Sequence, residues 1–179
     1  MKRIHIVGTS GSGKTHLASR LSEILNIKHT QIDGVFWQDY WQSLPPEKFK
    51  EKIAAITEKK KWIFCGNYSI AREIIWKKAD TLIWLDLPFS TTLKQLFQRT
   101  LNRSLDKEKL WGTQNTENFR MSFASRDSII LWMLKTYRRN KRHYSHWVAN
   151  PPHSQMKTIR LTSHSEADRW LLKTFQSKK

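Results

Sequence analysis

The sequence predicts an α/β protein in which a five-stranded parallel sheet is covered by helices on both faces. Short apolar runs of strand length alternate with helix-length amphipathic stretches along nearly the whole chain. The runs are apolar throughout, as is typical of strands buried on both faces. No linker, internal repeat or low-complexity segment interrupts the 179 residues, so we expect one domain over residues 1–179.

The strand prediction rests on β-branched, aromatic and leucine residues between turn signals. WIFCG and TLIWLDL are clear examples. In a parallel sheet of this kind, ligands bind at the carboxyl ends of the strands, where Asp33, Asn67 and Asp86 are expected. The predicted strands are residues 2–7, 27–33, 62–66, 81–87 and 156–161.

The helix prediction rests on apolar residues at i, i+3 and i+4 spacing. Pro45 and Pro46 stand where a helix favours proline, at its start. Ser90 is expected to cap the fourth helix, and Ser163 with Glu166 forms a capping box for the last. The predicted helices are residues 16–25, 45–60, 69–79, 90–105, about 119–148, and the stretch after Ser163.

A glycine-rich motif follows the first strand directly. GTSGSGKT, residues 8–15, fits G-x-x-x-x-G-K-[ST] at a strand-to-helix turn, which is the geometry of a P-loop. Its backbone N–H groups and the helix start hold phosphates, Lys14 reaches the β- and γ-phosphates, and Thr15 binds Mg²⁺. The sequence therefore predicts ATP and Mg²⁺ as cofactors. The expected nucleotide contacts are Gly8, Ser10, Gly11, Ser12, Gly13, Lys14, Thr15 and His16.

The chain is strongly basic, with 32 Lys and Arg against 15 Asp and Glu and a net charge of +17. The charge favours polyanionic partners, and the run YRRNKRHY (137–144) mixes cations with stacking groups, so non-specific nucleic-acid binding stays open beside nucleotide binding. No run approaches the ~18 apolar residues of a membrane span, so no membrane partner is expected. Cys65 is the single cysteine, which fits a reducing compartment, and we expect a cytoplasmic protein.

Several stretches together resemble one family, the adenylate-kinase-related P-loop proteins known as DNA topology modulation proteins. They are GTSGSGKTHLA, IDGVFW, GNYSIAR, ADTLIWLDLP and SRDSIILWMLKTYRRN, in order along nearly the whole chain. The resemblance implies a three-layer P-loop fold like that of nucleoside monophosphate kinases, ATP binding and kinase activity. Two departures stand out: Cys65 replaces a usual acidic residue, and GTQNTE replaces a stretch that carries an arginine.

Arginines are expected to close over the transferred phosphate, because phosphoryl transfer depends on positioning and charge neutralisation. Arg99 and Arg103 are four residues apart on one helix, so both point the same way. In related small kinases a lid after such a helix supplies arginines, and residues 104–118 are the expected lid. Lys14, Asp33, Arg99 and Arg103 are the predicted catalytic residues.

Asp33 is expected to orient the acceptor hydroxyl, accept its proton, or bind Mg²⁺ through water. Asp86 ends an apolar strand as in a Walker B segment and, with Thr15, is a predicted metal ligand. The predicted acceptor contacts are Asp33, Trp37, Asn67, Arg72 and Arg126, with stacking tryptophans and arginine forks.

Three functions remain open from the sequence. The first is a kinase that moves the γ-phosphate of ATP to a small acceptor, with a lean toward a nucleoside or nucleotide. The second is a nucleic-acid-binding ATPase that modulates DNA topology, and the third is a nucleotide-gated switch. The sequence names neither the acceptor nor the oligomeric state.

Overall fold

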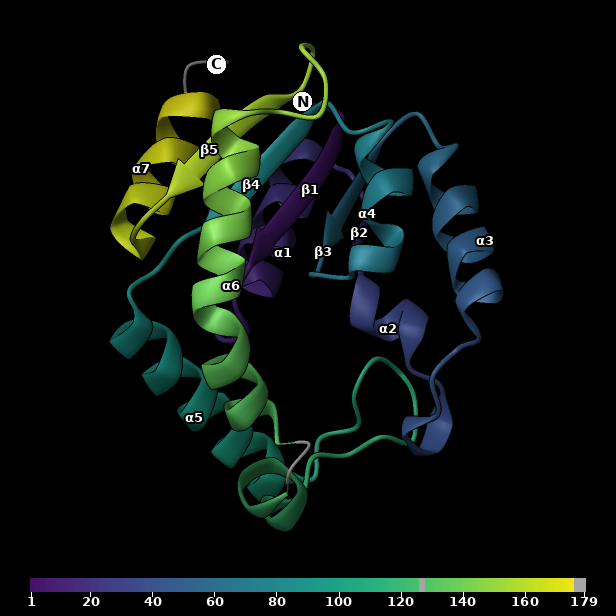
Figure 1. Ribbon diagram of the computed structural model, residues 1–179, viewed down its shortest axis with the longest axis vertical. Helices are drawn as coiled ribbons and strands as arrows, with labels where there is room; N and C mark the ends of the chain where they lie inside the picture. Colours follow the sequence, from purple (N-terminus) through teal and green to yellow (C-terminus); the bar gives the residue numbers. More distant parts are fainter. Residues whose placement is uncertain (126–127, 176–179) are drawn as a thin grey trace.

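A five-stranded, all-parallel sheet with helices on both faces forms the protein (Figure 1), in a computed structural model that describes residues 1–125 and 128–175. The predicted fold class is confirmed. The strand order is β2-β3-β1-β4-β5. The strands are β1 (Arg3–Gly8), β2 (His29–Gln31), β3 (Trp62–Cys65), β4 (Thr81–Leu85) and β5 (Lys157–Leu161).

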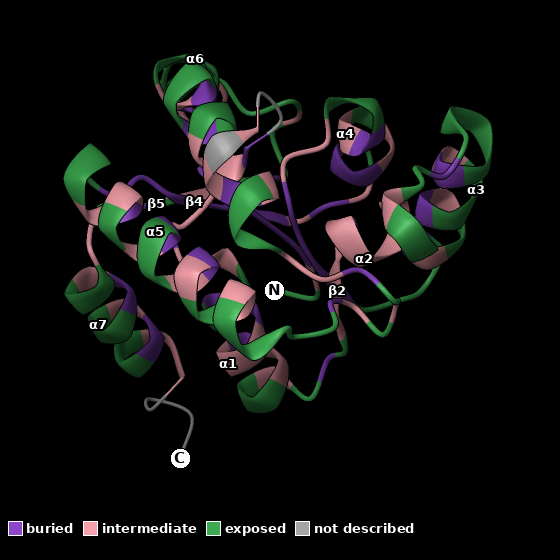
Figure 2. Ribbon diagram, turned by 90° about the horizontal axis from the view of Figure 1, so that it is seen from below, coloured by how far each residue is buried: buried purple, intermediate pink, exposed green. Residues whose placement is uncertain are grey.

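The helices connect these strands and cover the sheet. They are α1 (Lys14–Leu25), α2 (Ile32–Phe36), η1 (Asp39–Trp41), α3 (Pro46–Thr57), α4 (Ser69–Trp76), α5 (Phe89–Asp106), η2 (Arg120–Ala124), α6 (Ile129–Ala149) and α7 (His164–Phe175). Seen from below, α3, α4 and α6 lie on one side of the strands, and α1 and α7 lie on the other (Figure 2). The protein therefore has the predicted three layers, with the sheet between two layers of helices.

The three central strands β1, β3 and β4 contribute side chains to two separate cores, because successive side chains point to opposite faces. In β3, for example, Phe64 packs with the α3, α4 and α6 side chains, whereas Ile63 and Cys65 pack with those of α1 and α7. In β1, Ile4 and Ile6 are fully buried in the second core. Burial on both faces explains why the strands read as continuous apolar runs.

Three element boundaries differ from the sequence prediction. The second strand ends at Gln31, and Asp33 lies in the first turn of α2, where a carboxylate is favoured by the helix dipole. The long helix begins at Ile129, because Ser128 caps it through its Oγ, which accepts from the Ile130 N–H at 3.2 Å. Ser90 is not a cap, since α5 begins at Phe89 after Pro88.

The predicted capping of the last helix by Ser163 is confirmed, but the return bond of Glu166 goes to Thr162 and not to Ser163 itself. The Ser163 Oγ accepts from the Glu166 N–H at 3.1 Å, and the Glu166 carboxylate accepts from the Thr162 N–H at 2.7 Å. No helix in the described part of the chain has the length and apolar character needed to cross a membrane.

Candidate functional site

The P-loop joins the carboxyl end of β1 to the first turn of α1. Gly11 and Gly13 have φ of 87° and 86°, a region that favours glycine. A Cβ on Gly11 would lie 2.5 Å from the Thr92 carbonyl oxygen, so a side chain at this position would collide with α5. The loop is therefore closed tightly against α5, and it requires glycine at Gly11, a variable position of the motif, as well as at the motif glycine Gly13.

Lys14 is held by the loop itself. Its Nζ donates to the carbonyl oxygens of Gly8 at 2.6 Å and Thr9 at 3.0 Å. Burial lowers the pKa of Lys14 to about 8, while the nearby Asp33 and Cys65 oppose that shift. The ammonium group thus stays mainly protonated at neutral pH and lies among groups from three strand ends.

Asp33 is positioned by a hydrogen bond from β3's carboxyl end. Tyr68 Oη donates to Asp33 Oδ1 at 2.8 Å. Burial, reinforced by the Asp33 charge, raises the pKa of Tyr68, so the phenol remains a donor at any ordinary pH. The charge of Asp33 also acts on Lys14 and Arg99. The structure therefore brings three of the predicted catalytic residues together: Lys14, Asp33 and Arg99.

Asn67 fixes the P-loop to the end of β3. Its Oδ1 accepts from the Gly8 N–H at 3.2 Å, and its Nδ2 donates to the Gly8 carbonyl at 2.6 Å. Both ends of the amide are therefore occupied by the backbone of one P-loop residue. The bonds of Asn67 therefore position the P-loop, instead of the acceptor contact that the sequence predicts.

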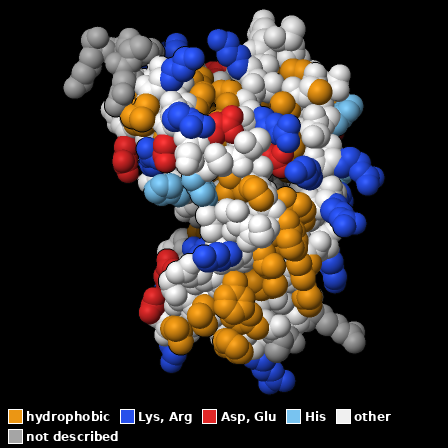
Figure 3. All heavy atoms as spheres, turned by 90° about the vertical axis from the view of Figure 1, so that its left-hand side faces the viewer, with side chains coloured by type: hydrophobic (Ala, Val, Ile, Leu, Met, Phe, Trp, Pro, Cys, Tyr) orange, Lys and Arg blue, Asp and Glu red, His pale blue; other side chains and the backbone are white. Residues whose placement is uncertain are grey.

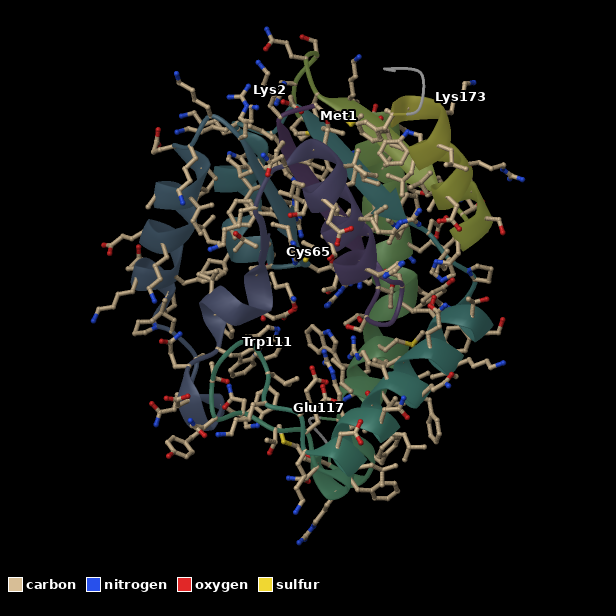
Figure 4. The ribbon with its side chains drawn as sticks, turned by 180° about the vertical axis from the view of Figure 1, so that it is seen from behind. Met1, Lys2, Cys65, Trp111, Glu117 and Lys173 are labelled. Carbon is tan, nitrogen blue, oxygen red and sulfur yellow. The ribbon has the colours of Figure 1, made fainter. Side chains whose placement is uncertain are left out.

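Cys65 lies directly beneath the same cluster. Burial raises the pKa of its thiol to about 11, against the opposing influence of Lys14 and of a hydrogen bond with Thr15. The residue is therefore a neutral thiol that packs in the core under α1. Figure 4 shows Cys65 near the middle of the molecule, with Trp111 and Glu117 below it.

The two arginines of α5 that the sequence singles out differ in their partners. Arg103 pairs with Glu108 and Glu117, each at 3.3 Å. Arg99 has an Nε that is shielded from solvent and lacks a hydrogen-bond partner among the described residues. Burial and the adjacent Arg103 lower the pKa of Arg99, although it remains a cation at neutral pH. Of the two arginines, Arg99 is thus the one with an unused hydrogen-bond donor among the described residues.

Glu117 is a site residue that sequence reasoning missed. Its side chain is 11% exposed, and its Oε2 has no hydrogen-bond partner among the described residues. Its sequence neighbourhood gives no periodic or motif signal, because its proximity to Arg103 arises only from the folding of the loop after α5. That loop, residues 107–118, is called the cap loop below.

The cap loop is docked on the aromatic segment that follows α2. Asn115 is buried; its Oδ1 accepts from the Trp41 N–H at 2.6 Å, and its Nδ2 donates to the Gln38 carbonyl at 2.8 Å. Trp111 donates through Nε1 to Gln31 Oε1 at 3.1 Å and stacks edge-on against Trp41 at 5.9 Å. The predicted lid spans 104–118, but residues 104–106 belong to α5, so the loop is shorter.

Trp37 belongs to the same aromatic segment, and its ring forms an aromatic wall with those of Phe36 and Trp41. Its ring lies 5.6 Å from the Trp41 ring and 4.9 Å from that of Phe36, both edge-on. Because α2 carries both Asp33 and the start of this segment, the wall begins one helical turn beyond the carboxylate. Trp37 therefore remains a candidate acceptor contact.

Other predicted site residues lie elsewhere. The Asp86 carboxylate is taken by Arg160 of β5, at 3.0 Å from Nε, and by Lys141 at 3.6 Å, so it is a structural ion-pair centre instead of the expected metal ligand. Arg72 lies over the Trp76 ring at 5.4 Å, away from Lys14 and Asp33, and we leave it out of the acceptor site. Arg126 lies outside the described residues.

The residues present fit a nucleotide and its metal ion, although Asp86 is not among the metal ligands as the sequence predicts. The glycine cradle and the buried Ser12 Oγ, which lacks a hydrogen-bond partner among the described residues, suit a phosphate chain. Thr15 and Asp33 supply the oxygen donors that Mg²⁺ prefers. No group of three or more His, Cys, Asp or Glu side chains that could hold a metal by themselves occurs within residues 1–125 and 128–175.

No family model matches the chain. The Bacillus subtilis (strain 168) protein YqaC, whose function is uncharacterized, is 30% identical over 104 residues, which is 57% of this chain and 58% of YqaC. This chain thus spans less than two thirds of YqaC. A shikimate kinase from Sulfurihydrogenibium sp. (strain YO3AOP1) is 28% identical over 144 residues, 72% of this chain and 82% of that enzyme.

Solved structures with the same architecture include two shikimate kinases. The enzyme from Bacteroides thetaiotaomicron aligns with a TM-score of 0.60 at 11% identity, over 97% of this chain and 98% of that one. The enzyme from Acinetobacter baumannii, in complex with shikimate, aligns with a TM-score of 0.53 at 17% identity, over 99% and 95%. The fold is that of the P-loop kinases.

Proposed function

We propose that the protein is an ATP-dependent phosphotransferase that moves the γ-phosphate of ATP to a hydroxyl group of a small acceptor. The observation that carries the proposal is the convergence of Lys14, Asp33 and Arg99 at the carboxyl edge of the sheet, beside a glycine cradle. Each has a role that phosphoryl transfer requires. The kinases to which the chain is similar support the same reaction class.

The P-loop and its two cations bind and neutralise the phosphate chain. Backbone N–H groups of residues 8–15 face the phosphates, and Lys14 moves from the Gly8 and Thr9 carbonyls to the β- and γ-phosphate oxygens. Arg99 uses its free Nε and fork on the transferred phosphoryl group. Thr15 and Asp33 would hold a Mg²⁺ ion, which would supply further charge neutralisation.

Asp33 accepts the proton of the attacking hydroxyl. The Tyr68 bond fixes one carboxylate oxygen and leaves the other for the acceptor. A hydroxyl must lose its proton during attack, whereas a phosphate acceptor is already anionic at neutral pH, so a fixed carboxylate here favours a hydroxyl acceptor. The shikimate kinases named above act, by their names, on shikimate, which carries hydroxyl groups, and this supports an alcohol over a nucleoside monophosphate.

A DNA-directed ATPase is not our proposal, although the resemblance to DNA topology modulation proteins raises it. Within the basic run, Tyr144 is buried and Tyr137 donates to the Leu87 carbonyl at 3.0 Å. Neither phenol is placed to stack on a base, and Lys141 is engaged with Asp86. The net charge alone supports only weak, salt-sensitive attraction.

A coupled ADP-release assay over hydroxyl acceptors tests the proposal. The panel contains shikimate, gluconate, simple sugars, nucleosides and, as a separate class, nucleoside monophosphates. We expect one of the hydroxyl compounds to stimulate ADP release in the wild-type protein and in Lys28→Ala, which removes an exposed lysine outside the site. Lys14→Ala should abolish that stimulation. Stimulation by duplex DNA and by no small acceptor would contradict the proposal.

A further inference from the structure

A second cavity lies at the opposite end of the sheet from the P-loop. It has a volume of about 770 Å³ and opens between α4, the turn before β4, the end of α6 and the loop before β5. Arg3, at the start of β1, is on its wall, and its neighbours Met1 and Lys2 stand at the top of Figure 4, far from the labelled Trp111 and Glu117. The nucleotide cannot reach this cavity, so it belongs to a different ligand.

The charged groups on the wall leave two cations unpaired. Arg3 pairs with Asp80, and Lys78 pairs with Glu58. Arg72 and Lys77 have no ion pair among the described residues. The charged side chains that line the cavity are Arg3, Arg72, Lys77, Lys78, Glu73 and Asp80. Four cations against two carboxylates leave the cavity net positive, and Glu73 alone opposes the two unpaired cations.

Two tryptophans form an apolar wall beside those cations. Trp76 is 4% exposed and lies 5.3 Å from the Trp147 ring, edge-on. The Trp76 ring is fixed on its far side, since its Nε1 donates to His5 Nδ1 at 2.8 Å, and its backbone carbonyl contacts His153 Nε2 at 3.1 Å. Arg72 lies over the same ring at 5.4 Å. The two rings meet at 71° and Arg72 covers one face of Trp76, so the tryptophans form an apolar corner beside a guanidinium group that has no ion pair among the described residues.

We propose that this cavity is a binding site for a small planar anion, an aromatic ring that carries a carboxylate or phosphate. The ring packs against Trp147 and the part of Trp76 that lines the cavity, and the anion accepts hydrogen bonds from Arg72 and is attracted by the Lys77 ammonium group. The volume is within the range of pockets that take such molecules, about 300 to 1,000 Å³. A purely apolar ligand would cover the Arg72 guanidinium without giving it a partner. An anion without a ring would leave the tryptophan side chains in contact with water.

Titration followed by NMR tests the site with three probes. Naphthalene-2-carboxylate carries both the ring and the anion, naphthalene-2-methanol carries the ring alone, and acetate carries the anion alone. The readout is the indole N–H resonances of Trp76 and Trp147 in ¹⁵N-labelled full-length protein, with the Trp147 signal assigned through Trp147→Phe. We expect naphthalene-2-carboxylate to shift both resonances with a Kd of about 1 mM or tighter, and the other probes to bind about tenfold more weakly.

Three variants distinguish binding in the cavity from non-specific binding elsewhere on the protein. Arg72→Gln should weaken naphthalene-2-carboxylate binding about tenfold, and Ser154→Phe, at an exposed position on the wall, should block it. Arg138→Gln removes the same charge from an exposed position of α6 and should change nothing. Should Arg72→Gln fail to fold, Lys77→Gln at an exposed position carries the same test with a smaller loss.

The proposal is overturned by any of three results. They are the absence of shifts at both tryptophans, equal binding of the carboxylate and the neutral alcohol, and wild-type affinity in both Arg72→Gln and Ser154→Phe. Addition of Mg-ATP should leave the shifts in place, since the two sites lie at opposite ends of the sheet. Displacement of the probe by Mg-ATP would place it at the P-loop and would also count against the cavity.

Discussion

At the scale of single residues, the proposed mechanism depends most on Asp33, the base that accepts the proton of the attacking hydroxyl. It is fixed by Tyr68 at 2.8 Å and lies near both Lys14 and Arg99. It stands in the first turn of α2, directly after β2. One substitution removes its basicity with little change in volume.

We expect Asp33→Asn to lower kcat with the hydroxyl acceptor by a factor of about 10² or more, because general-base catalysis is typically worth 10² to 10⁴. Steady-state kinetics with the identified acceptor measures it. Asp106→Asn, at an exposed position at the end of α5, is the matched control and should behave as wild type. Unchanged kcat, KM and magnesium dependence in Asp33→Asn would make Asp33 a turn residue.

His5 predicts how stability changes with pH. Burial lowers its pKa from 6.5 to about 4, and its Nδ1 accepts from Trp76, so the neutral ring is required. The unfolded state takes up a proton near pH 6.5 that the folded state refuses until about 4. The free energy of unfolding should therefore be full above pH 6.5 and fall by up to about 3 kcal/mol toward pH 4.

Urea unfolding at several pH values measures this loss. His5→Gln keeps a polar side chain of similar length but does not titrate, so its stability should vary less than that of the wild type over this interval. An equally steep pH dependence in His5→Gln would show that other groups cause it.

At the scale of secondary-structure elements, the cap loop packs on residues 31–41, the stretch that contains α2 and the segment after it. Their contact is made by Asn115, which bridges Trp41 and Gln38, and by Trp111, which packs on Gly34 and bonds Gln31. A Cβ on Gly34 would lie 3.0 Å from the Trp111 Cβ, which shows how closely the two segments approach. The loop is thus anchored by a few identifiable bonds.

Asn115→Ala should release the cap loop while the sheet stays folded. It removes two hydrogen bonds from a buried amide and leaves the Trp41 N–H and Gln38 carbonyl unpaired, at a cost of about 1 to 3 kcal/mol to the docked state. Hydrogen exchange should accelerate in residues 107–118, and KM for the acceptor should rise. Exchange that is unchanged there but faster throughout would instead indicate global destabilisation. Asn102→Ala, at an exposed position of α5 outside the cap loop, is the control.

The sequence predicted the elements well where local chemistry decides them. The P-loop, the five strands and the Ser163 cap all follow from spacing and from residue preference. It failed where contacts between distant segments decide. Asp86 resembles a metal ligand in sequence, but Arg160 is brought beside it by the pairing of β4 with β5. Arg72 resembles an acceptor contact, but its helix turns it toward Trp76.

At the scale of the whole molecule, the sheet separates two ends of different chemistry. The carboxyl ends of the strands carry the P-loop, Asp33 and the cap loop, and the amino ends carry the second cavity. A third surface stands apart from both. Figure 3 shows apolar side chains gathered on one face, and the exposed Phe97, Trp132 and Leu134 come from α5 and α6. The chain as a whole carries a net charge of +17.

Nucleotide binding should stabilise the whole fold through the P-loop. A ligand present at 100 times its Kd adds about 2.7 kcal/mol, which in a chain of this size raises Tm by roughly 5 to 10 °C. Differential scanning fluorimetry with Mg-ATP measures the shift. Lys14→Ala should lose most of it, while Lys28→Ala should keep it. A shift that survives in Lys14→Ala would place the nucleotide elsewhere.

The central claim is that the γ-phosphate reaches a hydroxyl group of a small acceptor. The most direct measurement follows that phosphoryl group: the wild-type protein is incubated with γ-³²P-labelled ATP, Mg²⁺ and the stimulating acceptor, and the products are separated. The proposed mechanism predicts label in a phosphate ester of the acceptor, with Asp33→Asn slowing its appearance about 100-fold or more. Label found only in inorganic phosphate, whichever acceptor is supplied, would contradict the claim and make the protein an ATPase.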